Sequence, residues 1–333
     1  SEGRNEKIIE AIADSIRNVG GVRLLSVEPD KDYNRSVVTF VGEPAGVVEA
    51  AFRSTKAATE LIDMSKHRGE HPRLGATDVV PFVPISGVTM TDCVQLAHLY
   101  GKRVASEIKI PIYLYEYAAQ TPERRNLANI RKGEYEGLAE KLKDPNWKPD
   151  FGPPVFNEKS GATVAGARKF LIAYNVNLNT PDSSLAHEIA LRIRESGRPK
   201  KDESGNVVKN EKGEKVIIPG SLQAVKAMGV LLERLNIAQV SINLVDFEIT
   251  PPHVAFEEVR KEAQTLGIDA TGSEIVGLTP LKALLMAGEF YVQRKGLGEK
   301  QTEEDLVRLA VEGLGLSQLE PFNPKKKVID YQL

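Results

Sequence analysis

Apolar residues recur at helical spacing in the first stretch of the chain, NEKIIEAIADSIRNV. Ile8, Ile9, Ile12 and Ile16 fall on one side of a helix, and Asn5 stands where a helix cap is expected. After it, VRLLSVE and SVVTFVG are rich in branched residues and nearly alternate between apolar and polar positions, which is typical of strands. The chain is therefore expected to begin with a helix followed by two strands.

The same reading extends through the rest of the first half. We predict a helix over 45–62, a strand in DVVPFVPI, a helix in TMTDCVQLAHLYGKRVASEI, a strand in IPIYLYEYA and short helices over 120–145. The proline-rich segment 145–165 follows and reads as a connection between two lobes.

The second half gives a complete order of elements. The pattern predicts a strand in ARKFLIAYNVNL (167–178), a helix over 183–196, strands in SLQAVKAMGV and AQVSINLVDFEIT, a helix over 253–266, a strand over 272–278, and helices over 280–293 and 303–314. Up to the last strand this is β-α-β-β-α-β, the split unit of ferredoxin-like folds. The polar, glycine-punctuated segment 201–220 reads as an exposed hairpin inserted in it.

The first half has the same order without an opening strand, so a strand is expected to be missing before Ser1. The predicted fold class is α/β (α+β), with two ferredoxin-like βαββαβ subdomains and a ligand groove between them. The predicted subdomains are residues 1–160 and 161–333.

Composition narrows the class of protein. The chain has 333 residues, 41% of them hydrophobic, and a net charge of −2, which gives no basic surface typical of nucleic-acid binding. No apolar run reaches the ~18 residues of a membrane span. The single cysteine, Cys93, allows no internal disulfide and is expected to be a buried thiol. A cytoplasmic protein with no nucleic-acid or membrane partner is expected.

The segment MSKHRGEHPRLGATDVVPF raises the question of chemistry. His67 and His71, with Glu70, spell H-x-x-E-H, the inverted zinc-protease signature. A helical zinc site is disfavoured, because Gly69 weakens a helix and Pro72 pushes the residue before it out of helical geometry. Two readings stay open: a solvated charged loop, or an acid–base histidine among anion-binding arginines.

The segment GATVAGARKFL does not complete a phosphate-binding loop, because Ala167 and Arg168 stand where lysine and a hydroxyl residue belong. Its small residues are expected to permit close approach of backbone or ligand. Neither G-x-G-x-x-G nor G-x-S-x-G occurs, so nothing supports a dinucleotide-binding or serine-hydrolase reading. The preceding DFGPPVFNEKSG is a rigid loop at the expected junction of the lobes.

Many colinear blocks resemble one family. They include SEGRNEKIIEAI, LIDMSKHRGEHPRLGATDVVPFVP, RKGEYEGL, PDFGP, GATVAGARKFLIAYNVNL, QVSINLVDFE and VGLTPLKALL. The chain resembles glutamate formimidoyltransferase along its whole length, a family that includes the amino-terminal domain of formimidoyltransferase-cyclodeaminase. That family begins with a short strand ahead of S-E-G. No cyclodeaminase domain is expected in this chain.

The resemblance implies transfer of a formimino group from N-formimino-L-glutamate to N5 of tetrahydrofolate, a step of histidine degradation. Tetrahydrofolate would be a co-substrate, without metal or nucleotide, and the protein would be a homodimer that relies on a separate cyclodeaminase downstream. The family's catalytic histidine, in G-E-H-P-R, is His71 here. Its folate loop matches the segment from Gly152 to Gly161, which comprises Gly152, Pro153, Pro154, Val155, Phe156, Asn157, Glu158, Lys159, Ser160 and Gly161.

The supporting roles are hypotheses drawn from charge. Carboxylates would stabilise a cationic formimino group, and arginines would hold the carboxylates of the donor. Lys169 and Arg168 suit the glutamyl tail of folate. The expected substrate-binding residues are Glu28, Asn34, Arg35, Asp63, Glu70 and Arg73, with Arg68 as a further candidate.

Three alternatives remain open at this stage. One is transfer of a formyl group between 5-formyltetrahydrofolate and glutamate, and another is a folate-binding protein without catalysis. The third is a metal-dependent hydrolase that uses H-x-x-E-H.

Overall fold

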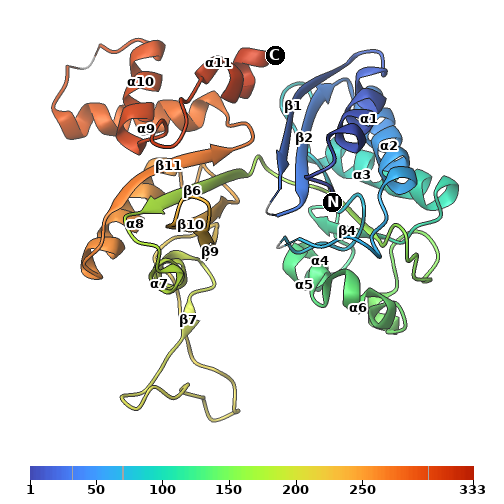
Figure 1. Cartoon of the computed structure of the whole chain (residues 1–333), viewed down its shortest axis with the longest axis horizontal. Coiled ribbons are helices and arrows are strands. Elements are labelled where there is room, and N and C mark those ends of the chain that lie inside the picture. The colour runs from blue at the N-terminus through green and yellow to red at the C-terminus, as the bar shows by residue number, and fades with distance from the viewer. Residues whose placement is uncertain (32, 70, 299) are drawn as a thin grey trace. The chain divides into compact units, whose positions relative to one another are not determined.

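The computed structural model describes residues 1–31, 33–69, 71–298 and 300–333 (Figure 1). The chain forms two compact units, Ser1–Lys169 and Phe170–Leu333. We call them the N-terminal unit and the C-terminal unit. The predicted boundary between residues 160 and 161 precedes the observed one by nine residues, because the strand that closes the N-terminal unit runs to Ala167.

The N-terminal unit has the predicted α-β-β-α-β order, extended by further elements. In chain order these are α1 (Glu6–Arg17), β1 (Val22–Asp30), β2 (Arg35–Gly42), α2 (Pro44–Leu61), β3 (Val79–Phe82), α3 (Met90–Glu107), β4 (Ile112–Glu116), α4 (Pro122–Arg125), α5 (Leu127–Arg131), α6 (Glu134–Lys141), η1 (Pro145–Trp147) and β5 (Thr163–Ala167). The short helices predicted for 120–145 are α4, α5 and α6. Asn5 caps α1 as expected, accepting hydrogen bonds from the backbone of Lys7 and Ile8.

The described strands of this unit form two sheets. β1 and β2 make an antiparallel hairpin in which Asp30 lies opposite Arg35. β5 lies between β3 and β4, and all three run parallel. Helix α3 covers the parallel sheet and buries Cys93, which confirms the predicted buried thiol. Among the described residues this unit therefore lacks the four-stranded antiparallel sheet of a ferredoxin-like fold.

Strand β5 was not predicted from the sequence. The small residues at 161–167 do permit close approach of backbone, as expected, because a Cβ at Gly161 would lie 2.0 Å from Leu74 O and one at Gly166 2.5 Å from Tyr115 O. A single strand was expected over 167–178. Instead all five residues of β5 are buried in the centre of the parallel sheet, and the next strand starts only at Ile172. A short buried run between two parallel neighbours shows no alternation of apolar and polar positions, which removes the usual sequence signal.

The C-terminal unit has the β-α-β-β-α-β order predicted for it, with the inserted hairpin and further helices after the last strand. Its elements are β6 (Ile172–Leu178), α7 (Ser183–Ile193), β7 (Arg198–Pro199), β8 (Ile217–Ile218), β9 (Val225–Leu232), β10 (Ile237–Leu244), α8 (Pro252–Thr265), β11 (Ala270–Val276), α9 (Leu281–Lys295), α10 (Glu303–Leu314), α11 (Pro324–Lys327) and η2 (Ile329–Gln332). The four long strands form one antiparallel sheet in the order β11-β6-β10-β9. Helices α7 and α8 pack on it over a single apolar core.

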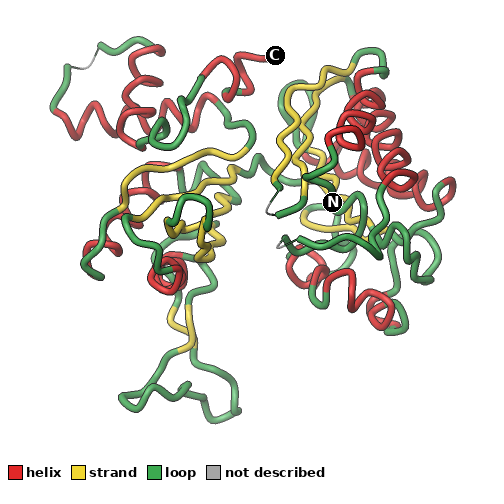
Figure 2. The backbone as a smooth tube through the Cα atoms, viewed as in Figure 1, coloured by secondary structure: helices red, strands yellow, loops and turns green. Residues whose placement is uncertain are grey.

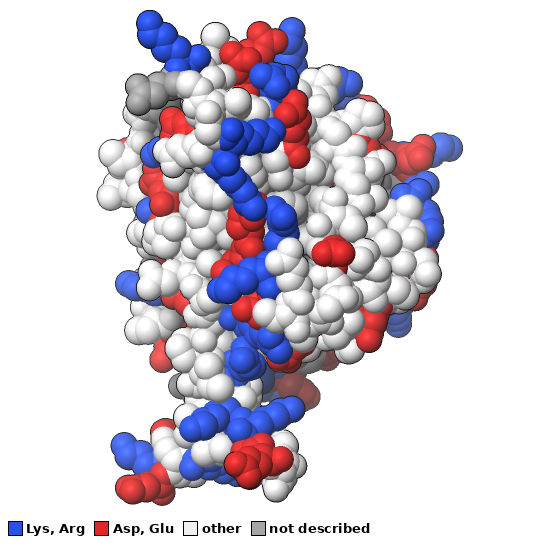
Figure 3. Space-filling view, turned by 90° about the vertical axis from the view of Figure 1, so that its left-hand side faces the viewer, with Lys and Arg blue, Asp and Glu red and all other residues white. Residues whose placement is uncertain are grey.

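The inserted hairpin projects from the C-terminal unit as predicted. Its base is paired through β7 and β8, isolated bridges join Lys201 to Val207 and Lys209 to Lys215, and the remainder is loop (Figure 2). Lys and Arg side chains lie beside Asp and Glu side chains on this projection (Figure 3). Among the described residues, no helix has both the length and the apolar composition needed to cross a membrane.

Candidate active site

The G-E-H-P-R motif lies in the connection between α2 and β3, residues 62–78. The described part of this connection contains no helix, so its two histidines do not share a helical face. Three backbone bonds tie it to the segment 152–162: Met64 N–H donates to Lys159 O at 2.9 Å, Ala76 N–H to Ser160 O at 2.9 Å, and Ala162 N–H to Leu74 O at 3.1 Å. The candidate catalytic loop and the candidate folate loop are therefore neighbours within one unit.

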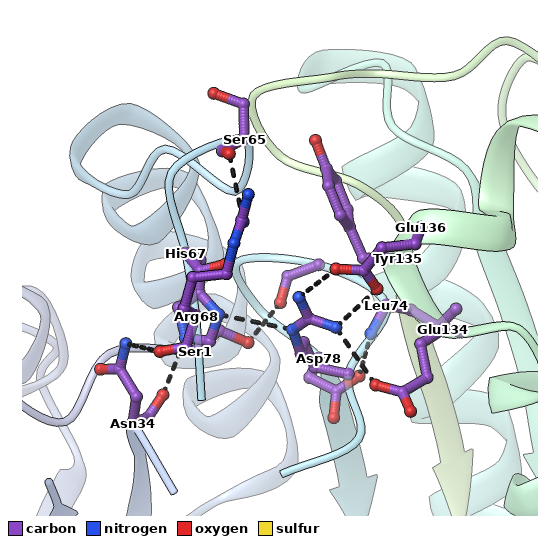
Figure 4. A network of polar contacts seen from close by, with 12 residues as sticks. Ser1, Asn34, Ser65, His67, Arg68, Leu74, Asp78, Glu134, Tyr135 and Glu136 are labelled. Carbon is purple, nitrogen blue, oxygen red and sulfur yellow. Dashed lines mark hydrogen bonds and ion pairs between the residues drawn. The ribbon is translucent and has the colours of Figure 1, made fainter. Parts of the chain in front are cut away.

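His67 serves to hold this connection in shape. Its ring is buried, with Nε2 2.8 Å from the carbonyl of Asn34, and Nδ1 accepts a hydrogen bond from Arg73 Nε at 3.4 Å (Figure 4). Both ring nitrogens are thus occupied. Among the described residues no group of three or more His, Cys, Asp or Glu side chains is placed to hold a metal ion.

Arg73 belongs to the same network. Its side chain is only 7% exposed and forms ion pairs with Glu134 at 3.1 Å and Glu136 at 2.6 Å (Figure 4). Glu136 raises the pKa of this guanidinium by hydrogen bonding to it. These contacts anchor the connection to α6, so they support a structural role for Arg73 in place of the expected grip on substrate.

Asn34, the last residue of the turn between β1 and β2, fastens the hairpin to the same connection. Its side chain accepts from Gly3 N–H at 3.0 Å and donates to Arg68 O at 2.8 Å. Its φ of 48° lies in the left-handed region that asparagine tolerates better than most residues. Asn34 was expected to bind substrate, but the structure uses both ends of its amide internally.

This anchoring brings Arg35 to His71. Arg35 opens β2, and its Nη1 lies 2.7 Å from His71 Nε2. A guanidinium can only donate, so Nε2 is the acceptor and the imidazole proton sits on Nδ1. The ring of Tyr33 meets the His71 ring edge-on with centroids 6.1 Å apart, and the guanidinium of Arg35 lies 5.7 Å from the Tyr33 centroid.

The surroundings keep His71 neutral. Burial, followed by the positive charges of Arg35 and Arg131, lowers the pKa of His71 to about 3. Arg131, at the end of α5, forms an ion pair with Asp78, and its buried Nε has no hydrogen-bond partner. At neutral pH the site thus presents an uncharged imidazole that two guanidinium groups act on, which suits a proton acceptor beside an anionic ligand.

Close packing of backbone against backbone fixes this arrangement at Gly69. A methyl group there would lie 2.4 Å from Tyr33 O and 2.7 Å from Asn34 Cβ, both in the hairpin turn. The connection can touch the hairpin only because residue 69 has no side chain.

We expect Gly69→Ala to lower the free energy of unfolding by about 1–3 kcal/mol, because the hairpin turn must shift to admit the methyl group. Urea denaturation measures the change. Gly137→Ala is the matched control, since a methyl group at that position in α6 meets nothing within 4 Å. Equal stability of the two variants would contradict the packing described here.

The candidate folate loop has its own internal order. Gly152 and Gly161 have φ values of 86° and 65°, and Asn157 Oδ1 accepts from Ser160 N–H at 3.0 Å. Lys159 Nζ donates to Glu60 O at the end of α2, at 2.7 Å. Glu158 O accepts from Tyr135, and the Tyr135 ring packs against Phe156.

Exposure differs along this loop. Val155 is 64% exposed and Glu158 is exposed, whereas the Oγ of Ser160 is buried without a hydrogen-bond partner. Of its prolines, Pro153 is half-buried and Pro154 exposed.

The other expected residues lie as follows. Asp63 is bound by Lys66 and Ser65, which lower the pKa of its carboxyl to about 2. Glu28 lies on β1 opposite Val37. Arg168 donates to Lys169 O at the end of the unit. Glu70 falls outside the described residues.

Tyr33, Asp78 and Arg131 complete the surroundings of His71 and were not expected from the sequence. Tyr33 sits in a turn and Arg131 ends a short helix, with no spacing motif to mark either one. Only the positions of these residues in the folded chain show that they lie near His71. Fold and site together define a two-unit α/β protein with a neutral histidine held against an arginine.

Comparison with known proteins identifies the family. Residues 1–168 match the model of the formiminotransferase domain, N-terminal subdomain, and residues 173–333 match the model of the formiminotransferase domain. The chain belongs to the formiminotransferase family.

Individual relatives agree with this assignment. A glutamate formimidoyltransferase of Thermoplasma acidophilum is 46% identical over 90% of this chain and 92% of that protein. One of Streptococcus pyogenes serotype M1 is 43% identical over 88% of this chain and 91% of that protein. The formimidoyltransferase-cyclodeaminase of Mus musculus is 50% identical over 99% of this chain, which spans 58% of the mouse protein.

Proposed function

We propose that this protein is a glutamate formimidoyltransferase, which moves the formimino group of N-formimino-L-glutamate to N5 of tetrahydrofolate. Family membership and the two relatives named for this activity support the proposal. The observation that carries it is His71, an uncharged imidazole with Nε2 as acceptor, in a loop bonded along its backbone to the candidate folate loop.

The reaction requires a group that both takes and returns a proton. A bond forms between the formimino carbon and N5 of the folate, and the bond from that carbon to the nitrogen of glutamate breaks. One proton leaves N5 and one reaches the departing nitrogen. Bound tetrahydrofolate would supply the nucleophilic N5 amine, and His71 Nε2 would take its proton and return it to glutamate. Such a positioned proton transfer contributes about 10²–10⁴-fold in rate.

Charge around His71 suits the donor. N-formimino-L-glutamate has two carboxylates, and guanidinium groups bind carboxylates through paired, charge-assisted hydrogen bonds. Arg35 and Arg131 both lie close enough to lower the pKa of His71. The same two cations thus favour an anionic donor and keep the base unprotonated.

For the folate, the loop from Gly152 to Gly161 supplies the contacts. The exposed side chain of Val155 offers apolar surface. Lys169 and Arg168 remain the proposed contacts of the glutamyl tail. The homodimer, the cytoplasmic location and the separate downstream cyclodeaminase stay predictions of the sequence.

The test is release of glutamate from N-formimino-L-glutamate in the presence and absence of tetrahydrofolate. We expect turnover only with tetrahydrofolate, and a slower rate when the donor is N-formyl-L-glutamate. A faster rate with the formyl donor would replace this proposal with formyl transfer. Saturable folate binding without any turnover would replace it with a binding protein.

The low pKa of His71 also predicts the pH dependence of catalysis. The neutral imidazole is the active form, and kcat/KM reports the ionisation of the free enzyme. Because the folded-state pKa is about 3, His71 stays neutral as the pH falls from 8 to about 5.5. We expect kcat/KM to change by less than about twofold over this range. An imidazole with its ordinary pKa of about 6.5 would instead cost roughly tenfold at the acid end.

A further inference from the structure

Arg35 has an unusual partner for a half-buried arginine. Its one side-chain hydrogen bond among the described residues goes to a neutral imidazole, His71 Nε2. The nearby carboxylates act on it only through space: Asp30 accepts from the Tyr33 backbone, and Asp78 pairs with Arg131. Burial lowers the pKa of Arg35. A guanidinium has five N–H donors, so most of those of Arg35 make no hydrogen bond to a described residue.

The atom that Arg35 occupies is the one that catalysis needs. His71 carries its proton on Nδ1, because its Nε2 accepts from Arg35. Nε2 therefore holds the only lone pair that can accept a proton from a substrate. While Arg35 donates to it, that lone pair is covered.

A carboxylate is the ligand that would draw Arg35 away. A carboxylate carries the opposite charge and accepts two parallel hydrogen bonds from a guanidinium, whereas the neutral imidazole of His71 accepts one. Arg131 provides a second positive charge, and its buried Nε makes no hydrogen bond. The Tyr33 ring, 5.7 Å from the guanidinium, offers a flat surface on which it can lie in another position.

We propose that Arg35 is a carboxylate-operated cap on His71: a carboxylate of the donor substrate takes the guanidinium from His71 Nε2 and so uncovers the base. This inference rests on the proposed function for the identity of the donor. It makes Arg35 both a specificity residue and a positioning residue, because a donor without the carboxylate would leave the base covered.

One arm of the test needs no turnover. Nitrogen-15 NMR of the His71 ring is recorded in the whole protein, in wild type and in Arg35→Gln, with and without glutarate. Glutaramide, the uncharged analogue, is the matched control. We expect glutarate, but not glutaramide, to raise the pKa of His71 in wild type by at least about 1, a tenfold change in its acid constant. In Arg35→Gln we expect a raised pKa already without ligand and no further response.

The proposal is overturned if glutarate moves the His71 resonance equally in wild type and Arg35→Gln, or if Arg35→Gln leaves the pKa of His71 unchanged. If the glutamine variant folds poorly, the same NMR titration is recorded with Arg35→Lys. Lysine keeps the charge but lacks the paired donors, so a response weaker than that of wild type is expected.

The kinetic arm separates this role from a structural one. In Arg35→Gln we expect KM for N-formimino-L-glutamate to rise at least about tenfold, with KM for tetrahydrofolate within about twofold of wild type. A fall in kcat with both KM values unchanged would mean that Arg35 only supports the loop, and would refute the cap. If wild type fails to turn over the donor, the proposed function fails, while the NMR arm still decides whether Arg35 caps His71.

Discussion

His71→Ala is expected to lower kcat by about 10²–10⁴-fold while leaving the fold intact. The variant loses the imidazole whose Nε2 is proposed to accept the proton at neutral pH. Its Michaelis constants should change little, because Arg35 and Arg131 remain to bind the carboxylates. Steady-state turnover of N-formimino-L-glutamate with tetrahydrofolate measures the effect.

The matched control is His187→Ala, which removes an exposed imidazole from α7 in the other unit. It should keep wild-type turnover. Thermal unfolding of both variants excludes a loss caused by misfolding. If His71→Ala retains more than about a tenth of the wild-type kcat, His71 does not carry the proton.

We expect Gly161→Ala to destabilise the N-terminal unit more than alanine at any other glycine of that unit. Gly161 has a φ of 65°, and its added Cβ would lie 2.0 Å from Leu74 O, in the strand-like bridge that joins the folate loop to the histidine loop. The strained dihedral and the backbone clash act together, so we expect a loss of more than about 3 kcal/mol in unfolding free energy. KM for tetrahydrofolate should rise in any protein that folds.

Gly213→Ala separates the two causes. Gly213 has a similar φ of 77°, but a methyl group there meets nothing within 4 Å, since it lies at the exposed end of the inserted hairpin. We expect a loss of about 1 kcal/mol from the dihedral alone and no change in activity. Equal losses in the two variants would show that the two loops are not locked together as described.

The elements that the sequence predicted well are those with a clear period. The stripe of isoleucines defined α1, and the β-α-β-β-α-β order of the C-terminal unit followed from helix and strand periods. Strand β5 was not predicted because it is short, fully buried and built of small residues. It therefore shows neither alternation of apolar and polar positions nor large apolar side chains. Missing it also moved the expected boundary between the units from Lys169 back to residue 160.

The site was predictable only in part, and for a different reason. His71 and the loop after Gly152 were proposed from a family resemblance, and Arg35 from charge. Charge alone could not distinguish Arg35, which meets His71, from Arg73, which the two glutamates of α6 engage. Arg131 contributes from a short helix 60 residues beyond the motif, and only the folded chain brings it near.

The central claim is that His71 is a neutral base whose Nε2 is free of a proton. A pH titration of the His71 ring by NMR in the wild-type protein without ligand tests this most directly. We predict a ring that stays neutral from pH 8 to below pH 5, with the proton on Nδ1, in line with a pKa of about 3. A midpoint near the ordinary value of about 6.5, or a ring with its proton on Nε2, would contradict the account.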